Sequence, residues 1–73
     1  MTIKLYGTLG CPSCLMAKKY LDANEIEYKY MVIGQDIKIE DYIEKFNVSG
    51  VPLLVNGKNQ VLGFVPEDYD KIL

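Results

Sequence analysis

The stretch that decides the fold spans residues 2–14, with the sequence TIKLYGTLGCPSC. Its first part alternates polar and apolar residues, which predicts a β-strand over residues 2–6. Glycines then indicate a loop, and Pro12 suits the first turn of a helix because its missing N–H would have no partner there. We predict this helix from residue 12 to about residue 24. Two cysteines three positions apart therefore open a helix that directly follows a strand.

The rest of the chain repeats this alternation of strands and helices. We predict strands over residues 26–33, 51–55 and 60–64, and helices that begin near residues 39 and 66. A helix between the first two strands makes them parallel through a right-handed crossover, and the Asn56-Gly57 hairpin makes the last two antiparallel. We expect one α/β domain over residues 1–73, ordered β-α-β-α-β-β-α, with a four-stranded mixed sheet flanked by helices.

Composition excludes several classes of function. The 73 residues carry ten acids and eight scattered lysines, for a net charge of −2, with no arginine and no histidine. The basic patch of a nucleic-acid binder is therefore missing, and so are the general base of Ser-His and Cys-His hydrolases and the commonest zinc ligand. No apolar run reaches the roughly 20 residues of a membrane helix, and no signal-peptide pattern precedes the first strand. We expect a cytoplasmic protein without nucleic-acid or membrane partners.

Two other groups of residues have ordinary structural explanations. Most of the tyrosines are expected to be amphipathic packing residues, and these are Tyr20, Tyr28, Tyr30, Tyr42 and Tyr69. The Lys18-Lys19 pair is expected to lie on a solvated helix face. The remaining chemistry is that of the two cysteines.

Cys11 stands where a helix begins, so its sulfur faces backbone N–H groups that have no intrahelical partner. A free thiol has a pKa of about 8.5, and helix N-termini and C-x-x-C motifs lower it to roughly 3.5–7.5. A drop of about two units is a preference of about 2.7 kcal/mol for the anion, of which the helix dipole supplies only about 0.3–1 kcal/mol. Hydrogen bonds from amides and from Cys14 must supply the rest. We predict a moderately lowered pKa for Cys11.

A dithiol exchange mechanism follows from this arrangement. The Cys11 thiolate attacks a substrate disulfide, and Cys14 then attacks Cys11 and releases the reduced substrate. The reaction needs no histidine, no metal and no bound cofactor. Three other interpretations of the pair stay open: a structural disulfide, a metal site shared by two chains, and two inert buried thiols.

The combined motifs resemble the glutaredoxin family of the thioredoxin fold. They are a strand, Cys-Pro-x-Cys opening a helix, Gly-Val-Pro at residues 50–52 before a hairpin, and a glycine near the chain end. The resemblance covers essentially the whole chain and implies that Cys11 is the nucleophile and Cys14 the resolving thiol. It also implies that Pro52 is a cis-proline beside them, rather than a proline that only begins a strand, and that Val51 offers its backbone to an extended substrate.

The same resemblance implies a set of substrate or glutathione contacts, namely Tyr6, Thr8, Leu9, Pro12, Val51, Pro52, Gly63 and Phe64. Two departures stand out. Glutathione-dependent members usually carry Lys or Arg at the position of Thr8. They also carry a Gly-Gly and then a polar pair, whereas this chain has a single glycine there, followed by Glu67 and Asp68. Because glutathione carries two carboxylates, we expect it to bind weakly, although it is a candidate reductant.

The segment Gly63-Phe64-x-Pro66-Glu67 instead resembles NrdH-type redoxins, which are reduced by thioredoxin reductase and serve ribonucleotide reductase. Phe64 is then either a core aromatic residue or, with Leu9, a hydrophobic platform for a partner protein. We expect a monomer whose substrates are protein disulfides or mixed disulfides with small thiols, and whose electron donor is glutathione or thioredoxin reductase. A dimeric iron–sulfur or metal carrier that uses Cys11 from two chains is an alternative of another class.

Overall fold

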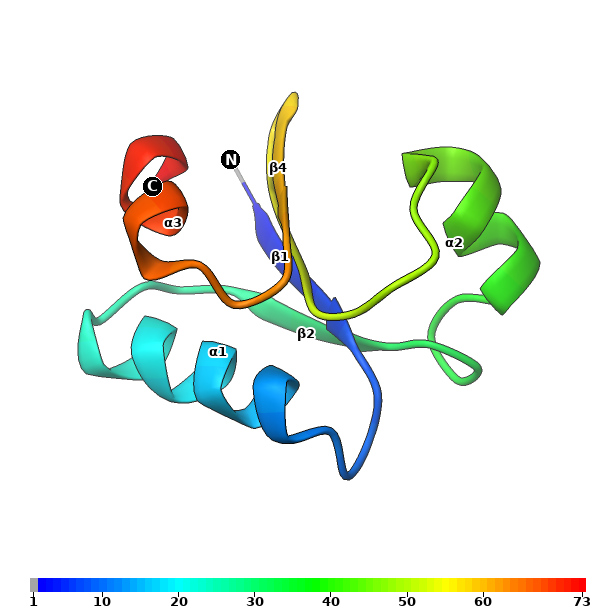
Figure 1. The fold of residues 1–73 in the computed structure, drawn as a ribbon, viewed down its shortest axis with the longest axis horizontal. Helices are drawn as coiled ribbons and strands as arrows, with labels where there is room; N and C mark the ends of the chain where they lie inside the picture. Colours follow the sequence, from blue (N-terminus) through cyan, green and yellow to red (C-terminus); the bar gives the residue numbers. More distant parts are fainter. Residues whose placement is uncertain (1) are drawn as a thin grey trace.

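A computed structural model describes residues 2–73 and has the predicted order of elements. Along the chain these are β1 (Ile3–Gly7), α1 (Pro12–Ala23), β2 (Lys29–Val32), α2 (Ile39–Phe46), β3 (Leu53–Asn56), β4 (Asn59–Leu62) and α3 (Pro66–Ile72) (Figure 1). In this part of the chain, no helix is long and apolar enough to cross a membrane.

The four strands form one mixed sheet in the order β2-β1-β3-β4. β1 runs parallel to β2, and β3 is antiparallel to both β1 and β4. In this register Leu5 of β1 lies opposite Tyr30 of β2 on one side and Leu54 of β3 on the other. The predicted topology is therefore confirmed, and β1, which leads into the cysteines, is a central strand.

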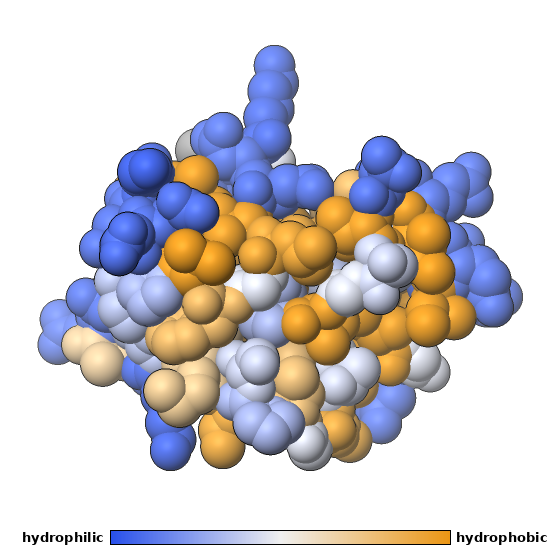
Figure 2. All heavy atoms as spheres, in the orientation of Figure 1, coloured by the Kyte–Doolittle hydropathy of each residue, from blue (hydrophilic) through white to orange (hydrophobic). Residues whose placement is uncertain are grey.

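The alternation along β1 sends neighbouring side chains into two separate cores. Leu5 belongs to a cluster with residues of α1 and α3, whereas Tyr6 packs with Tyr42 of α2. Figure 1 accordingly shows α1 and α3 on one side of the sheet and α2 on the other. Apolar atoms also occupy much of the face between α3 and α2, as Figure 2 shows.

Three strands differ in length from their predicted ranges, for local reasons. The amide of Ile26 donates to the carbonyl of Leu21 (3.0 Å) at the end of α1, so β2 begins later than predicted. β3 begins at Leu53 because the preceding Pro52 has no N–H to donate to the ladder. β4 stops before Gly63, whose φ of 89° is not a strand conformation.

Helix α2 has the predicted amphipathic stripe, but the sheet covers only part of it. Tyr42 is buried and Phe46 is half-buried. Ile39 and Ile43 stay 54% and 42% exposed, although they lie on the same stripe. Those two side chains are free to line a surface cavity beside the loop that precedes β3.

Candidate active site

The helix start holds Cys11 as an acceptor of backbone N–H groups. Cys11 is the N-cap of α1, with an extended backbone (φ −89°, ψ 117°), and its Sγ accepts a hydrogen bond from the N–H of Cys14 at 3.3 Å. Hydrogen bonds from the thiol and then the backbone N–H of Cys14 lower the pKa of Cys11. Smaller contributions come from the N–H of Ser13 and the hydroxyl of Thr8. The predicted direction of this shift, and its cause in direct hydrogen bonds, are confirmed.

The two thiols differ in access to solvent and in acidity. Cys11 is partly exposed, whereas Cys14 lies one turn further into α1 and is only 1% exposed. Burial raises the pKa of the Cys14 thiol, and its hydrogen bond to Cys11 raises it further. Both cysteines are free thiols. The pair therefore combines a reachable thiol that ionises easily with a buried thiol that keeps its proton.

The loop before β3 brings Val51 and Pro52 to the same end of the sheet. The Val51–Pro52 peptide bond is cis, as the family resemblance implies. Pro52 is buried, and its carbonyl accepts a hydrogen bond from the N–H of Gly63 at 2.7 Å. Tyr42 donates to the carbonyl of Gly50 at 2.7 Å and so holds the loop from the α2 side. Val51 is half-buried and lies outside the β3 ladder.

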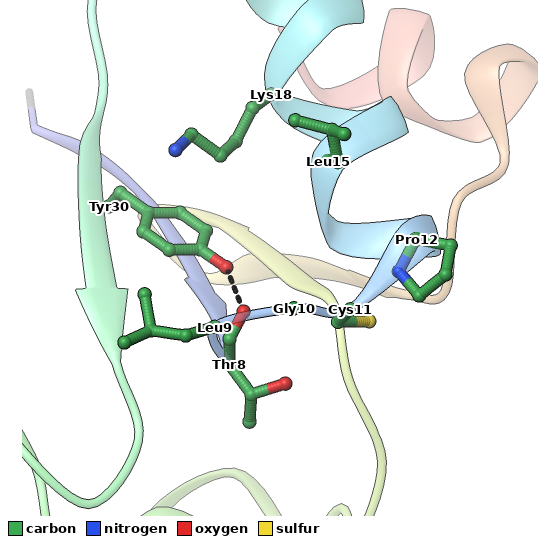
Figure 3. A pocket seen from close by; sticks show the side chains of 8 residues that line it. All are labelled: Thr8, Leu9, Gly10, Cys11, Pro12, Leu15, Lys18 and Tyr30. Carbon is green, nitrogen blue, oxygen red and sulfur yellow. Dashed lines mark hydrogen bonds between the residues drawn. The ribbon is translucent and has the colours of Figure 1, made fainter.

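A cavity of about 320 Å³ opens beside Cys11, between the loop, α1 and β2. It is lined by Cys11 and by three of the predicted contact residues, Thr8, Leu9 and Pro12. The other lining residues are Gly10, Leu15, Lys18 and Tyr30 (Figure 3). Tyr30 donates a hydrogen bond to the carbonyl of Thr8 at 2.9 Å, and Lys18 Nζ lies 4.5 Å from the centre of the Tyr30 ring. Figure 3 shows the sulfur of Cys11 pointing away from that ring.

Tyr30 and Lys18 are site residues that the sequence interpretation missed. It assigned Tyr30 to core packing and Lys18 to a solvated face. The parallel register opposite Leu5 puts Tyr30 on the α1 side of the sheet, and Lys18 lies one turn after Cys14 on α1. The combination of that register with the helix period is the signal that would have found them.

Of the predicted contact residues, Tyr6 is buried in the core, and Phe64 is half-buried and packs against the core. Tyr6 is 2% exposed, and its ring centre lies 5.6 Å from that of Tyr42 and 4.8 Å from that of Phe46. It does not line the cavity beside Cys11, and its role as a site-lining residue stays a prediction. Phe64 packs edge-on against Tyr20 and Tyr69, which favours the core interpretation over the exposed platform. The ring of Tyr6 is buried by α2, which is distant in sequence, whereas the half-buried ring of Phe64 packs against α3, which begins two residues later.

A second, smaller cavity of about 170 Å³ lies on the α2 side. It is lined by Thr8, Ile33, Ile39, Tyr42, Ile43, Ser49, Gly50 and Val51. Thr8 belongs to both cavities, so the two open on either side of the same loop. An extended chain at Val51 would have a mainly apolar surface next to it.

Comparison with known proteins agrees with this geometry. Residues 3–61 match the family described as Glutaredoxin. A relative from Clostridium pasteurianum, described as an uncharacterized glutaredoxin-like 8.6 kDa protein in rubredoxin operon, is 31% identical over 72 residues, covering 97% of this chain and 96% of that one.

Solved structures show the same fold at lower identity. The glutaredoxin grx-1 of Archaeoglobus fulgidus superposes with a TM-score of 0.83 at 22% identity, over 96% of this chain and 83% of that one. The glutaredoxin-like protein NrdH-redoxin of Escherichia coli superposes with a TM-score of 0.86 at 15% identity, over 100% of this chain and 96% of that one. The fold is thioredoxin-like.

Proposed function

Because this chain belongs to the glutaredoxin family of thiol-disulfide redox proteins, we propose that it reduces disulfides of polypeptides through Cys11 and Cys14. The observation that carries the proposal is the division between the two thiols. The Cys11 sulfur accepts the N–H of Cys14 and is reachable from solvent, whereas Cys14 is 1% exposed. A reachable anion is the attacking group in thiol–disulfide exchange, and a shielded neighbour suits the second step.

The reaction proceeds in two exchanges. The Cys11 thiolate attacks one sulfur of the substrate disulfide, a Cys11–substrate disulfide forms, and the other substrate sulfur leaves as a thiolate. Cys14 then loses its proton and attacks Cys11 Sγ. The Cys11–Cys14 disulfide forms, the bond to the substrate breaks, and the leaving sulfur takes up a proton. Two electrons pass from the dithiol to the substrate.

The surroundings of Cys11 favour a polypeptide over glutathione. Thr8 carries no charge where glutathione-dependent relatives carry a cation, and the first turn of α3 contains Glu67 and Asp68, which repel a carboxylate. The cavity beside Val51 has an apolar lining. A polypeptide paired with the backbone of Val51 would place a side chain there. We propose glutathione as a weakly bound electron donor or small substrate.

A second candidate donor is thioredoxin reductase, as for NrdH-type redoxins that serve ribonucleotide reductase. The segment from Gly63 to Glu67 favours it, because its sequence resembles that of these redoxins. The amide of Gly63 donates a hydrogen bond to the carbonyl of Pro52, so this segment lies beside the cis-proline loop. In both cases we propose a monomer that works in the cytoplasm, where free thiols persist.

The test is a coupled assay with a protein disulfide as substrate. One arm supplies glutathione, glutathione reductase and NADPH, and the other supplies thioredoxin reductase and NADPH. We expect turnover in the first arm that saturates only at high glutathione. Cys11→Ser should abolish activity, Cys14→Ser should accumulate the mixed disulfide, and Ser13→Ala, a change between the two thiols, should behave as the unmodified protein. Turnover only in the second arm would assign the protein to the second donor, and activity of Cys11→Ser would overturn the proposal.

A further inference from the structure

The tyrosine beside the buried thiol has no assigned role in the two exchanges. We propose that the Tyr30 hydroxyl is a further catalytic residue, which donates a hydrogen bond to the Cys14 sulfur as that sulfur becomes the attacking thiolate. This inference rests on the proposed function, because it concerns the second exchange of the same reaction. The three residues involved are Gly7, Cys14 and Tyr30.

Gly7 leaves the space in which the hydroxyl and the sulfur come together. Gly7 is the last residue of β1 and is buried. A Cβ added to Gly7 would collide with the hydroxyl oxygen of Tyr30 and would lie 2.8 Å from the sulfur of Cys14. Both atoms therefore approach the same point from different elements, with no side chain between them.

The Tyr30 ring is held so that its hydroxyl stays at this point. The ring stands on β2 opposite Leu5, and Lys18 of α1 lies over its face, with Nζ 4.5 Å from the ring centre. The hydroxyl donates to the carbonyl of Thr8 at 2.9 Å (Figure 3). Because a phenol has one O–H that can turn about the C–O bond, the same donor can turn to a neighbouring acceptor without moving the ring.

The charge states around Cys14 suit a donor and not a base. The titratable side chains that act on Cys14 are Cys11, Tyr30, Tyr42 and Tyr69, and the nearby cation is Lys18. Burial raises the pKa of Tyr30 to about 12, so its hydroxyl keeps its proton at neutral pH. A hydrogen bond donated to a thiolate stabilises the charged form, which burial of Cys14 otherwise disfavours.

The second exchange then runs as follows. With Cys11 bound to the substrate, Cys14 gives its proton to water, and the Tyr30 O–H turns from the Thr8 carbonyl to the Cys14 thiolate. Cys14 attacks Cys11 Sγ, the Cys11–Cys14 bond forms, and the bond between Cys11 and the substrate breaks. The substrate sulfur leaves with the electron pair and is protonated from water. Tyr30 ends with its own proton.

The test is Tyr30→Phe, which removes only the hydroxyl and keeps the ring under Lys18. A hydrogen bond to a charged group is strong enough that its loss should slow the second exchange by about ten- to a hundredfold. The mixed disulfide should accumulate in rapid-quench experiments, while its formation stays within about twofold of the original rate. Tyr28→Phe is the matched control, because Tyr28 packs against the same core and neighbours Asp22, not the cysteines; it should leave both rates unchanged.

Two further variants separate a catalytic role from a structural one. In a Cys11→Ser background, Tyr30→Phe should lower the fraction of Cys14 present as thiolate at a given pH by about tenfold, a readout that does not depend on turnover. In a Cys14→Ser background, Tyr30→Phe should leave the first exchange unchanged. An unslowed second exchange or an unaltered Cys14 titration would overturn the role of Tyr30. Absence of any mixed disulfide in Cys14→Ser alone would overturn the proposed function instead.

Discussion

Thr8 connects the parts of the site at the scale of single residues. Its carbonyl accepts the Tyr30 hydroxyl, its own hydroxyl lowers the pKa of Cys11, and its surface lines both cavities. The uncharged side chain thus acts by hydrogen bonding where a cation would act by charge. The largest contribution to the acidity of Cys11 nevertheless comes from Cys14, so the second thiol also prepares the first.

The pH dependence of Cys11 alkylation tests this order of contributions. Because hydrogen bonds lower the pKa of Cys11, the thiolate and the alkylation rate should decline only when the pH falls through that lowered value. Cys14→Ala should move the decline to higher pH, and Thr8→Val should move it the same way by less. Ser13→Ala keeps the backbone N–H and should leave the profile in place. A larger shift for Thr8→Val than for Cys14→Ala would contradict the assignment.

At the scale of elements, two helices hold the backbone beside the cysteines from opposite faces of the sheet. Tyr42 of α2 donates to the Gly50 carbonyl, and Tyr69 of α3 donates to the Gly63 carbonyl, both at 2.7 Å. The amide of Gly63 in turn donates to the carbonyl of Pro52. The position of the cis-proline loop therefore depends on contacts from both layers of helices.

Loss of one of these hydroxyls should destabilise the whole fold. Tyr69 is 0% exposed, so Tyr69→Phe leaves the Gly63 carbonyl without its donor and should cost about 1–3 kcal/mol in the free energy of unfolding. Tyr20→Phe is the matched control. Its hydroxyl bonds Asp70 at the surface, and its loss should cost about 0–1 kcal/mol. Urea unfolding measures both, and an equal cost for the two variants would argue against the holding role of Tyr69.

At the scale of the whole molecule, a net charge of −2 is spread over principal-axis extents of 30 × 27 × 19 Å. Electrostatic screening lengths are about 30 Å at 0.01 M salt and about 8 Å at 0.15 M. At low salt an approaching anion therefore experiences the charge of the entire protein, and at higher salt only the charges close to Cys11.

Reduction of the oxidised protein by glutathione should consequently speed up with salt. Glutathione is anionic and is repelled by the net negative protein, so screening should raise its rate by about twofold between 0.01 M and 0.15 M salt. A thiol that lacks carboxylates provides the comparison and should depend less on salt. A glutathione rate that falls with salt would indicate a local cationic site, for which Lys18 is the candidate beside Cys11.

Periodicity and motif spacing predicted the elements, their order and the cysteine pair, because these depend on contacts close in sequence. The orientation of residues on paired strands was harder to predict. Tyr6 and Tyr30 are both strand tyrosines, yet the ring of Tyr6 is buried against α2, whereas the hydroxyl of Tyr30 lies on the α1 side, close to Gly7. Their difference depends on which face of the sheet each strand residue occupies and on the parallel register of β1 with β2. Both depend on pairing between segments that are distant in sequence, so neither segment alone predicts them.

The outer strands of the sheet bear on how the protein behaves at high concentration. β2 and β4 are the two edge strands of the sheet, and each is four residues long. β2 begins with Lys29, and β4 begins with Asn59 and Gln60. Short edge strands that begin with polar residues are poor templates for joining sheets between molecules, so we expect copies of the chain to resist aggregation at high concentration.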